Sequence, residues 1–238
     1  MFSGAVSNGC AVGKIGVVLA CGPSLDDLPN AFWDSLAAPQ VVTVGINRVP
    51  AAYALASRGY MPDILFAHDM PVAPFNGNTR DLFQIWKLAA GNSWRIAALE
   101  NQAAPLAPVD QWIVRSEAAN GGADVSGKYR DGDIELEGVC IAESSADAAL
   151  NLLWRMGVRK VVLAGVDSYG LGYCRWAREL DPDQGAVACG RPEMVDFVES
   201  RWREIGASYR GELELWNCNP LSVACRVGTA QPGWGALK

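Results

Sequence analysis

The residues best suited to ligand chemistry lie in a short turn near the start of the sequence. Gly22, Pro23 and Ser24 follow Val17–Ala20, an apolar run of the kind that forms a buried strand. Glycine lets the backbone approach a ligand closely, proline stiffens the turn because its ring fixes φ, and the serine hydroxyl can cap a helix or bind a phosphate. The segment contains neither a Walker loop nor a dinucleotide fingerprint. The turn is therefore a candidate nucleotide site, and a capped strand-to-helix turn without a ligand is the alternative.

Other polar side chains follow later apolar runs of the sequence in the same way. They are Asn47, Arg48, His68, Asp69, Asp167, Ser168 and Tyr169. In an open sheet of parallel strands, a ligand binds beyond the carboxyl ends of the strands. Because each of these residues follows a predicted strand, the fold would bring them to one rim together with Ser24. Their convergence indicates a ligand site more specifically than any one of them does.

The elements that must position these residues alternate between strands and helices. Seven short apolar runs are predicted strands: Ile15–Ala20, Val41–Ile46, Asp63–Ala67, Arg95–Leu99, Gln111–Val114, Lys160–Val166 and Glu212–Trp216. Four stretches are predicted helices: Pro50–Arg58, Thr79–Leu88, Ser145–Met156 and Pro192–Ile205. This alternation predicts an α/β fold with a single doubly wound, mostly parallel sheet of Rossmann-like type.

Two stretches interrupt this pattern. Residues 116–139 and 170–190 carry many glycines and charges and show no apolar period. Long irregular segments in a compact domain often serve as lids or binding loops, so both are predicted to be lid-like. We find no internal repeat and no low-complexity linker, and therefore expect one domain over residues 1–238.

Composition narrows the class of protein further. Half of the 238 residues are hydrophobic and 19% are charged, which is enough for a real core. A net charge of −6 disfavours non-specific nucleic-acid binding. The seven cysteines form no Cys-x-x-Cys pair and there is one histidine, which argues against a zinc site and for reduced thiols. With no apolar run as long as a membrane span and no signal-peptide pattern, a cytoplasmic protein is expected.

Several of these segments resemble bacterial sialyltransferases that use CMP-sialic acid. Residues 21–25, Cys-Gly-Pro-Ser-Leu, are similar to the family's Asn-Gly-Pro-Ser-Leu turn. The longest match covers residues 156–169, which end in Gly-Val-Asp-Ser-Tyr where the family has Gly-Ile-Asp-Phe-Tyr. Short blocks of similarity run from Val17 to Ser222. The resemblance implies a GT-A-like fold and a glycosyltransferase that moves a sugar from a nucleotide-sugar donor to an acceptor hydroxyl, with no metal cofactor required.

The resemblance also implies roles for matched positions. Nucleotide binding falls to Gly22, Pro23, Ser24, Asn47, Ser144, Ser145 and Asp167. The family's paired tyrosines hydrogen-bond the leaving phosphate, and Tyr169 and Tyr173 fit that catalytic role. The family's histidine base lies in the loop that corresponds to Asp181–Arg191, which has no histidine here. Asp69, Asp183 and Glu193 are candidate substitutes, and Asp69 is taken as the catalytic candidate.

A second resemblance supports a different reaction. Residues 62–69, Pro-Asp-Ile-Leu-Phe-Ala-His-Asp, are similar to a strand of the archaeal 6-hydroxymethylpterin diphosphokinases, which share the Gly-Pro-Ser-Leu turn. This alternative implies a Mg²⁺-dependent pyrophosphokinase acting on a pterin-like molecule, with Asp69 and Asp167 at the metal. A catalytically degenerate nucleotide-binding module is a third possibility, which the missing histidine favours and the tyrosine pair opposes.

The acceptor is not specified by the sequence. A glycan hydroxyl is the precedent in the sialyltransferases. A hydroxylated DNA nucleobase is a second candidate, because Arg175, Trp176 and Arg178 could stack on a base. Ordinary solvated loop charge is the alternative explanation of these three residues.

Overall fold

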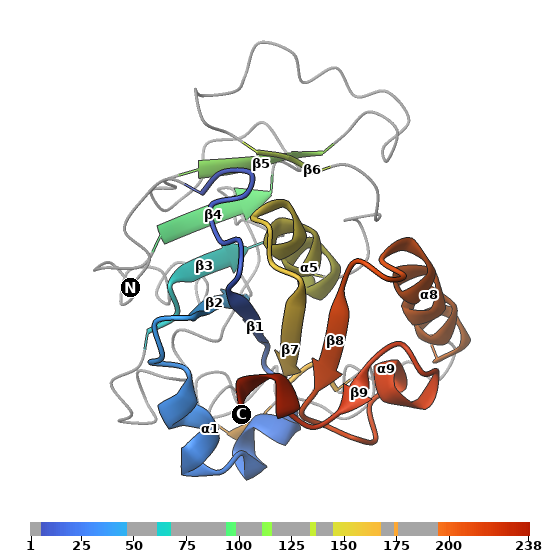
Figure 1. Ribbon diagram of the computed structural model, residues 1–238. Coiled ribbons are helices and arrows are strands. Elements are labelled where there is room, and N and C mark those ends of the chain that lie inside the picture. The colour runs from blue at the N-terminus through green and yellow to red at the C-terminus, as the bar shows by residue number, and fades with distance from the viewer. Residues whose placement is uncertain are drawn as a thin grey trace, which may run out of the picture.

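The sheet of the protein is built entirely from parallel strands (Figure 1). The computed structural model describes residues 6–46, 61–67, 94–98, 111–115, 134–136, 145–167, 174–175 and 195–238. In this part of the chain, nine strands form one sheet in the order β6-β5-β4-β3-β2-β1-β7-β8-β9. Their bounds are β1 (Ile15–Leu19), β2 (Val41–Ile46), β3 (Ile64–Ala67), β4 (Trp94–Ala98), β5 (Gln111–Arg115), β6 (Ile134–Leu136), β7 (Lys160–Ala164), β8 (Glu214–Asn217) and β9 (Gln231–Pro232).

The strand order reverses direction at the centre of the sheet. From β1 the chain builds outward through β2 to β6, and it then returns to place β7 on the other side of β1. Val18 of β1 is paired with Val44 of β2 and with Leu163 of β7. Because all these pairs are parallel, the carboxyl ends of β1, β2, β3 and β7 share one edge, as the sequence predicted.

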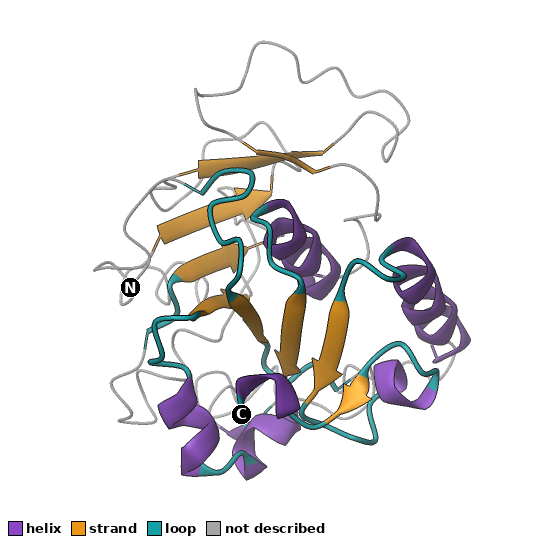
Figure 2. Ribbon diagram, in the orientation of Figure 1, coloured by secondary structure: helices purple, strands orange, loops and turns teal. Residues whose placement is uncertain are grey.

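Helices cover both faces of the sheet (Figure 2). On β1, Val18 contributes to one buried cluster and Val17 and Leu19 to the other, because successive strand residues face opposite sides. The first cluster includes residues of α5 (Ser145–Arg155), α8 (Val195–Ser208) and α9 (Val223–Arg226). The second is closed by η1 (Pro23–Asp27), α1 (Asn30–Ser35) and η4 (Gly235–Leu237). The α/β class and the parallel sheet are therefore confirmed.

The predicted strands and helices agree with the described elements except at their ends. All seven predicted strands are present, but β7 ends at Ala164 rather than Val166, because Gly165 adopts a φ of +71° that no strand continues. Helix α5 begins at Ser145 as predicted, and α8 continues to Ser208, beyond the predicted end at Ile205. The predicted helices at residues 50–58 and 79–88 lie outside the described residues.

Some elements of the structure were not predicted. The stretch 116–139 was expected to be a loop, but it contains the short strand β6. Three residues are too few to show a strand period, so the sequence pattern gives no signal there. Strand β9 is only two residues long and ends in Pro232, which suits the edge of a sheet where no ladder bond is needed. The short helices η1, α1, α9 and η4 were also missed.

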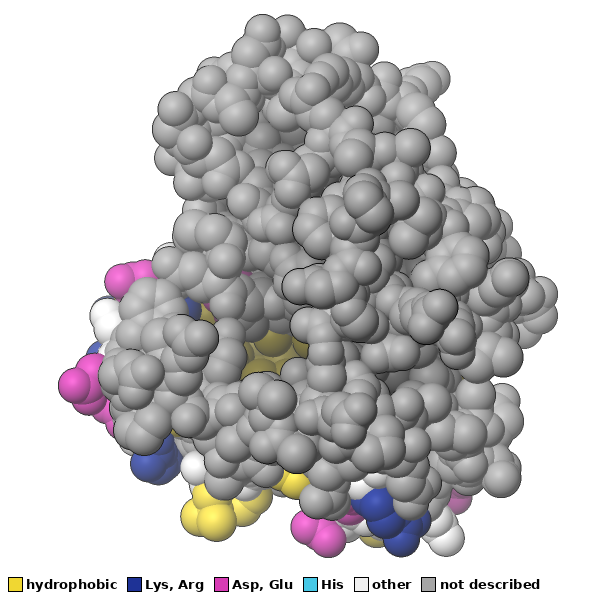
Figure 3. All heavy atoms as spheres, turned by 180° about the vertical axis from the view of Figure 1, so that it is seen from behind, with side chains coloured by type: hydrophobic (Ala, Val, Ile, Leu, Met, Phe, Trp, Pro, Cys, Tyr) yellow, Lys and Arg dark blue, Asp and Glu magenta, His cyan; other side chains and the backbone are white. Residues whose placement is uncertain are grey.

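The described cysteines are free thiols, as the composition predicted, and the described surface carries side chains of several kinds. Seen from behind, apolar, acidic and basic side chains emerge together along the lower edge of the described surface (Figure 3). Among the described helices, none is both long enough and apolar enough to cross a bilayer. The five described cysteines, Cys10, Cys21, Cys174, Cys218 and Cys225, are all free thiols.

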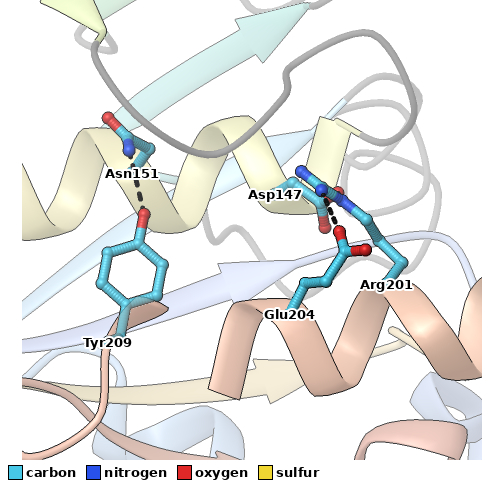
Figure 4. A network of polar contacts seen from close by, with 5 residues as sticks. All are labelled: Asp147, Asn151, Arg201, Glu204 and Tyr209. Atoms are coloured by element: carbon cyan, nitrogen blue, oxygen red, sulfur yellow. Dashed lines mark hydrogen bonds and ion pairs between the residues drawn. The ribbon is translucent and has the colours of Figure 1, made fainter. Parts of the chain in front are cut away.

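A polar seam joins α5 to α8 across the first core cluster (Figure 4). Arg201 Nε lies 3.2 Å from a carboxylate oxygen of Asp147, whose side chain is 3% exposed, and its Nη1 lies 2.8 Å from Glu204. One helical turn further on, Asn151 Nδ2 donates to the Tyr209 hydroxyl at 2.9 Å. Burial raises the pKa of Tyr209 to about 12, so its hydroxyl stays protonated. The seam fixes α5, and hence Ser145 at its first turn, relative to α8.

Arg201→Met is expected to lower the free energy of unfolding by about 1–3 kcal/mol, because it leaves the buried Asp147 carboxylate without its guanidinium partner. The matched control is Arg203→Met on the same helix. Arg203 pairs with Glu199 at 3.8 Å and its side chain is 62% exposed, so its loss should cost less than about 1 kcal/mol. Urea unfolding followed by circular dichroism measures both. Equal midpoints for the two variants would show that the seam does not stabilise the fold.

Candidate functional site

The turn after β1 is packed against the end of β7. The Ala20 N–H donates to the Ala164 carbonyl at 2.8 Å, and the Gly22 N–H donates to the Gly165 carbonyl at 2.8 Å. Backbone pairing thus continues past the end of both strands. A Cβ atom at Gly22 would lie closer than 3.0 Å to the Asp167 carboxylate and to the Gly165 carbonyl. Only glycine allows this close approach, which here is to Asp167 and Gly165 of the protein itself; the predicted approach to a ligand stays a prediction.

In the Ser24 turn, residues 21–25, the backbone N–H groups of Ser24 and Leu25 donate hydrogen bonds to other groups of the protein. Ser24 N–H donates to Asp167 Oδ2 at 2.8 Å, Leu25 N–H donates to the Gly22 carbonyl at 3.2 Å, and Pro23 has no N–H. The predicted helix cap is wrong. The turn enters the 3₁₀ helix η1, its N-cap position is Gly22, and no side chain caps it. Ser24 lies inside that helix instead.

The Ser24 side-chain hydroxyl therefore takes no part in these hydrogen bonds. Its Oγ atom is buried and has no hydrogen-bond partner among the described residues. Leaving a buried hydroxyl unpaired costs about 1–3 kcal/mol, so native proteins rarely tolerate one without a reason. The Ser24 hydroxyl is therefore the group of the turn whose hydrogen-bonding capacity is unused among the described residues.

Asp167 joins the Ser24 turn to the loop that follows β8. The Asp167 residue is 4% exposed, and its Oδ1 accepts a hydrogen bond from Asn219 Nδ2 at 2.9 Å while its Oδ2 accepts from Ser24. Asn217 holds the same loop in place, donating from Nδ2 to the Val166 carbonyl and accepting from Asn219 N–H, each at 2.9 Å. The ends of β1, β7 and β8 are thus tied together by side chains.

Asn217 and Asn219 were not among the predicted site residues. A signal was present, because the segment Trp-Asn-Cys-Asn-Pro-Leu-Ser at 216–222 follows a predicted strand. We call residues 217–222 the Asn loop. Asn219 Oδ1 also accepts from the Leu221 N–H at 2.9 Å, so one asparagine side chain fixes both the loop and Asp167.

Charged residues of both signs lie at the turn. The carboxylate of Asp26 in η1 accepts the backbone N–H of Arg175 at 2.8 Å, and the Cys174 N–H donates to the Cys21 carbonyl at 2.7 Å. Residues 174–175 therefore lie against the turn. Burial, with a smaller contribution from the Asp167 charge, raises the pKa of Cys218 to about 12. The Cys218 thiol stays protonated near neutral pH and is not a nucleophile.

The structure brings together one group of predicted site residues. Gly22, Pro23, Ser24 and Asp167 share one cluster at the β1–β7 edge. Ser145 lies at the start of α5, which packs on β1, β2 and β3. The remaining predicted residues lie outside the described part of the chain: Asn47, His68, Asp69, Ser144, Tyr169 and Tyr173.

The metal site of the pyrophosphokinase alternative involves Asp167 and Asp69, of which the structure describes Asp167. Among the described residues, no group of three or more His, Cys, Asp or Glu side chains is arranged to hold a metal ion. Each Asp167 oxygen already accepts one hydrogen bond from the protein. Asp69, its partner in the Mg²⁺ alternative, lies outside the described residues.

No family model matches this sequence, and no curated protein matches it either. The chain is thus defined by its α/β fold with a parallel sheet and by the cluster at the β1–β7 edge.

Proposed function

We propose that the protein is a glycosyltransferase that binds a nucleotide-sugar donor at the Ser24 turn. One observation carries the proposal: the Ser24 hydroxyl, buried and without a partner among the described residues, lies where the strand order reverses between β1 and β7. In doubly wound sheets of the Rossmann-like and GT-A-like kind, this reversal opens the crevice in which the ligand binds. A ligand that pairs with the Ser24 hydroxyl offsets the cost of its burial.

The reaction assigns a step to each group. The bond between the sugar's anomeric carbon and the donor phosphate oxygen breaks, and the acceptor oxygen bonds to that carbon. The acceptor's proton passes to a base, for which Asp69 is the candidate. Tyr169 and Tyr173 donate hydrogen bonds to the departing phosphate as its charge develops, so the scheme requires no metal. The roles of Tyr169 and Tyr173 rest on the resemblance to the sialyltransferases, whereas Asp69 is one of three possible substitutes for the family's missing histidine.

Asp167 takes a positioning role in this scheme. Its two carboxylate oxygens hold Ser24 from one side and Asn219 from the other. It therefore shapes the nucleotide site through Ser24, with Asn47, Ser144 and Ser145 as further candidate contacts. The acceptor is a glycan or a hydroxylated nucleobase.

A thermal-shift panel tests the proposal. The protein is heated with CMP, UDP, GDP and ATP, each with and without Mg²⁺, because a ligand that binds the folded state raises the melting temperature. Stabilisation by one nucleotide without Mg²⁺ supports the glycosyltransferase. Stabilisation by none of the four contradicts it. Slow hydrolysis of the matching nucleotide-sugar without acceptor separates an enzyme from a degenerate binding module.

Ser24→Ala and Asn47→Ala are each expected to weaken binding of the stabilising nucleotide by about 1–3 kcal/mol, or roughly 5- to 150-fold. Isothermal titration measures the loss. Ser35→Ala is the matched control, because the Ser35 hydroxyl donates to the Phe32 carbonyl within α1 and lies outside the Ser24 turn. Parental affinity in both site variants would place the nucleotide elsewhere.

A further inference from the structure

We infer that the Ser24 turn binds the uncharged, hydroxyl-bearing part of the nucleotide, its nucleoside, and that the phosphate lies outside the turn. This inference rests on the proposed function and specifies which part of the donor the turn receives. It follows from the donors, the charges and the hydroxyl that the turn presents.

The turn has few donors left for a phosphate. Loops that cradle phosphates do so with backbone N–H groups that point at the anion. Here the N–H groups of Gly22, Ser24 and Leu25 are bonded within the protein, and Pro23 has none. A phosphate at this turn would find a single hydroxyl where a phosphate loop offers several amides.

The charge at the turn disfavours an anion as well. The Asp167 carboxylate, which is almost fully buried, is bonded directly to the N–H of Ser24. Asp26 in η1 is exposed, so water screens its charge. The buried Asp167 carboxylate is screened little, and it would repel a phosphate placed at the turn. An uncharged group meets no such repulsion.

The Ser24 hydroxyl suits a ligand hydroxyl. A serine Oγ can donate one hydrogen bond and accept others, and the hydroxyls of a ribose do the same. A ribose hydroxyl can therefore both donate to and accept from Ser24 Oγ, so it satisfies this buried group without bringing a charge to the turn.

The test compares a nucleotide with its own nucleoside. If CMP is the nucleotide that binds, CMP and cytidine are titrated against the parent protein, Ser24→Ala and the control Ser35→Ala; for another base, the corresponding pair is used. Ser24→Ala is expected to weaken both ligands by the same factor, roughly 5- to 150-fold. Ser35→Ala should leave both affinities unchanged.

A second measurement guards against a trivial loss of folding. Because no described residue pairs with the buried Ser24 hydroxyl, Ser24→Ala should leave the unliganded protein as stable as the parent or more stable. Its urea midpoint is therefore expected to be equal or higher. A lower midpoint would show that the hydroxyl serves the fold and would overturn the inference.

The remaining outcomes separate the inference from the proposed function. A loss confined to CMP, with cytidine affinity unchanged, would place the phosphate at Ser24 and overturn the inference while leaving a nucleotide site intact. Unchanged affinity for both ligands would also overturn it, as would a parent that binds CMP without competition from cytidine up to the solubility limit. A parent that binds no nucleotide and no nucleoside would instead overturn the proposed function itself.

Discussion

Gly22→Ala is expected to lower the free energy of unfolding by about 1–3 kcal/mol and to abolish nucleotide binding. The backbone at Gly22 has φ −69° and ψ 156°, which alanine adopts without strain. The penalty is therefore purely steric: the new Cβ would press on the Asp167 carboxylate and the Gly165 carbonyl. Displacing Asp167 releases the Ser24 N–H that it holds and moves the hydroxyl away from the ligand. Urea unfolding and nucleotide titration measure the two effects.

Gly211→Ala supplies the contrasting control for Gly22→Ala. Gly211 has a φ of +79° and no atom within 4 Å of its virtual Cβ, so its substitution adds backbone strain without a clash. It lies before β8, at the amino end of that strand and away from the Ser24 turn. Gly211→Ala should lower the free energy of unfolding by about 1 kcal/mol. Its affinity for the nucleotide should equal that of the parent. A Gly22→Ala protein that also binds nucleotide like the parent would show that the ligand does not use the turn.

Tyr169→Phe is expected to lower turnover by roughly 10²- to 10³-fold, the usual loss when one donor to a developing oxyanion is removed. Nucleotide affinity should stay nearly unchanged, because the hydrogen bond strengthens only as the phosphate departs. Steady-state kinetics with the nucleotide-sugar, together with direct titration, separates the two quantities. Equal losses in affinity and turnover would mean that Tyr169 serves binding rather than leaving-group stabilisation.

Tyr209→Phe is the matched control for Tyr169→Phe. It removes a hydroxyl that accepts from Asn151 in the seam between α5 and α8, so it should lower stability and leave turnover unchanged. Turnover by the parent should also persist in EDTA. Full loss of transfer with the chelator, restored by Mg²⁺, would favour the pyrophosphokinase alternative with Asp69 and Asp167 at the metal.

Sequence patterns predicted the middle of the fold well because the central strands are buried on both faces. Strands such as β2, with the sequence Val-Val-Thr-Val-Gly-Ile, are almost continuously apolar and are recognised from composition alone. The rule that ligands bind at the carboxyl ends of parallel strands then placed Ser24 and Asp167 on one rim. The structure confirms that placement with a hydrogen bond between them.

The partners within the cluster could not be predicted in the same way. Asp167 accepts hydrogen bonds from the Ser24 N–H and from the Asn219 side chain. These contacts join residues that lie far apart in the sequence. The local sequence pattern also could not distinguish the 3₁₀ helix η1 from a capped α-helix, because a Gly-Pro-Ser segment can precede or begin either kind of helix. As a result, the sequence pattern placed Ser24 at the correct rim of the sheet, but its possible role as a helix cap was wrong.

The position of β1 at the centre of the sheet also has a consequence for biosynthesis. Ile15 of β1 is paired with Lys160 of β7, so roughly 145 residues must be translated before that edge of β1 meets its partner. At about 5–20 residues per second, the delay is on the order of 7–30 s. During this time the nascent chain carries an apolar strand with one unpaired edge, which is a template for aggregation. Ribosome-bound chaperones that shield β1 should therefore raise the yield of folded protein.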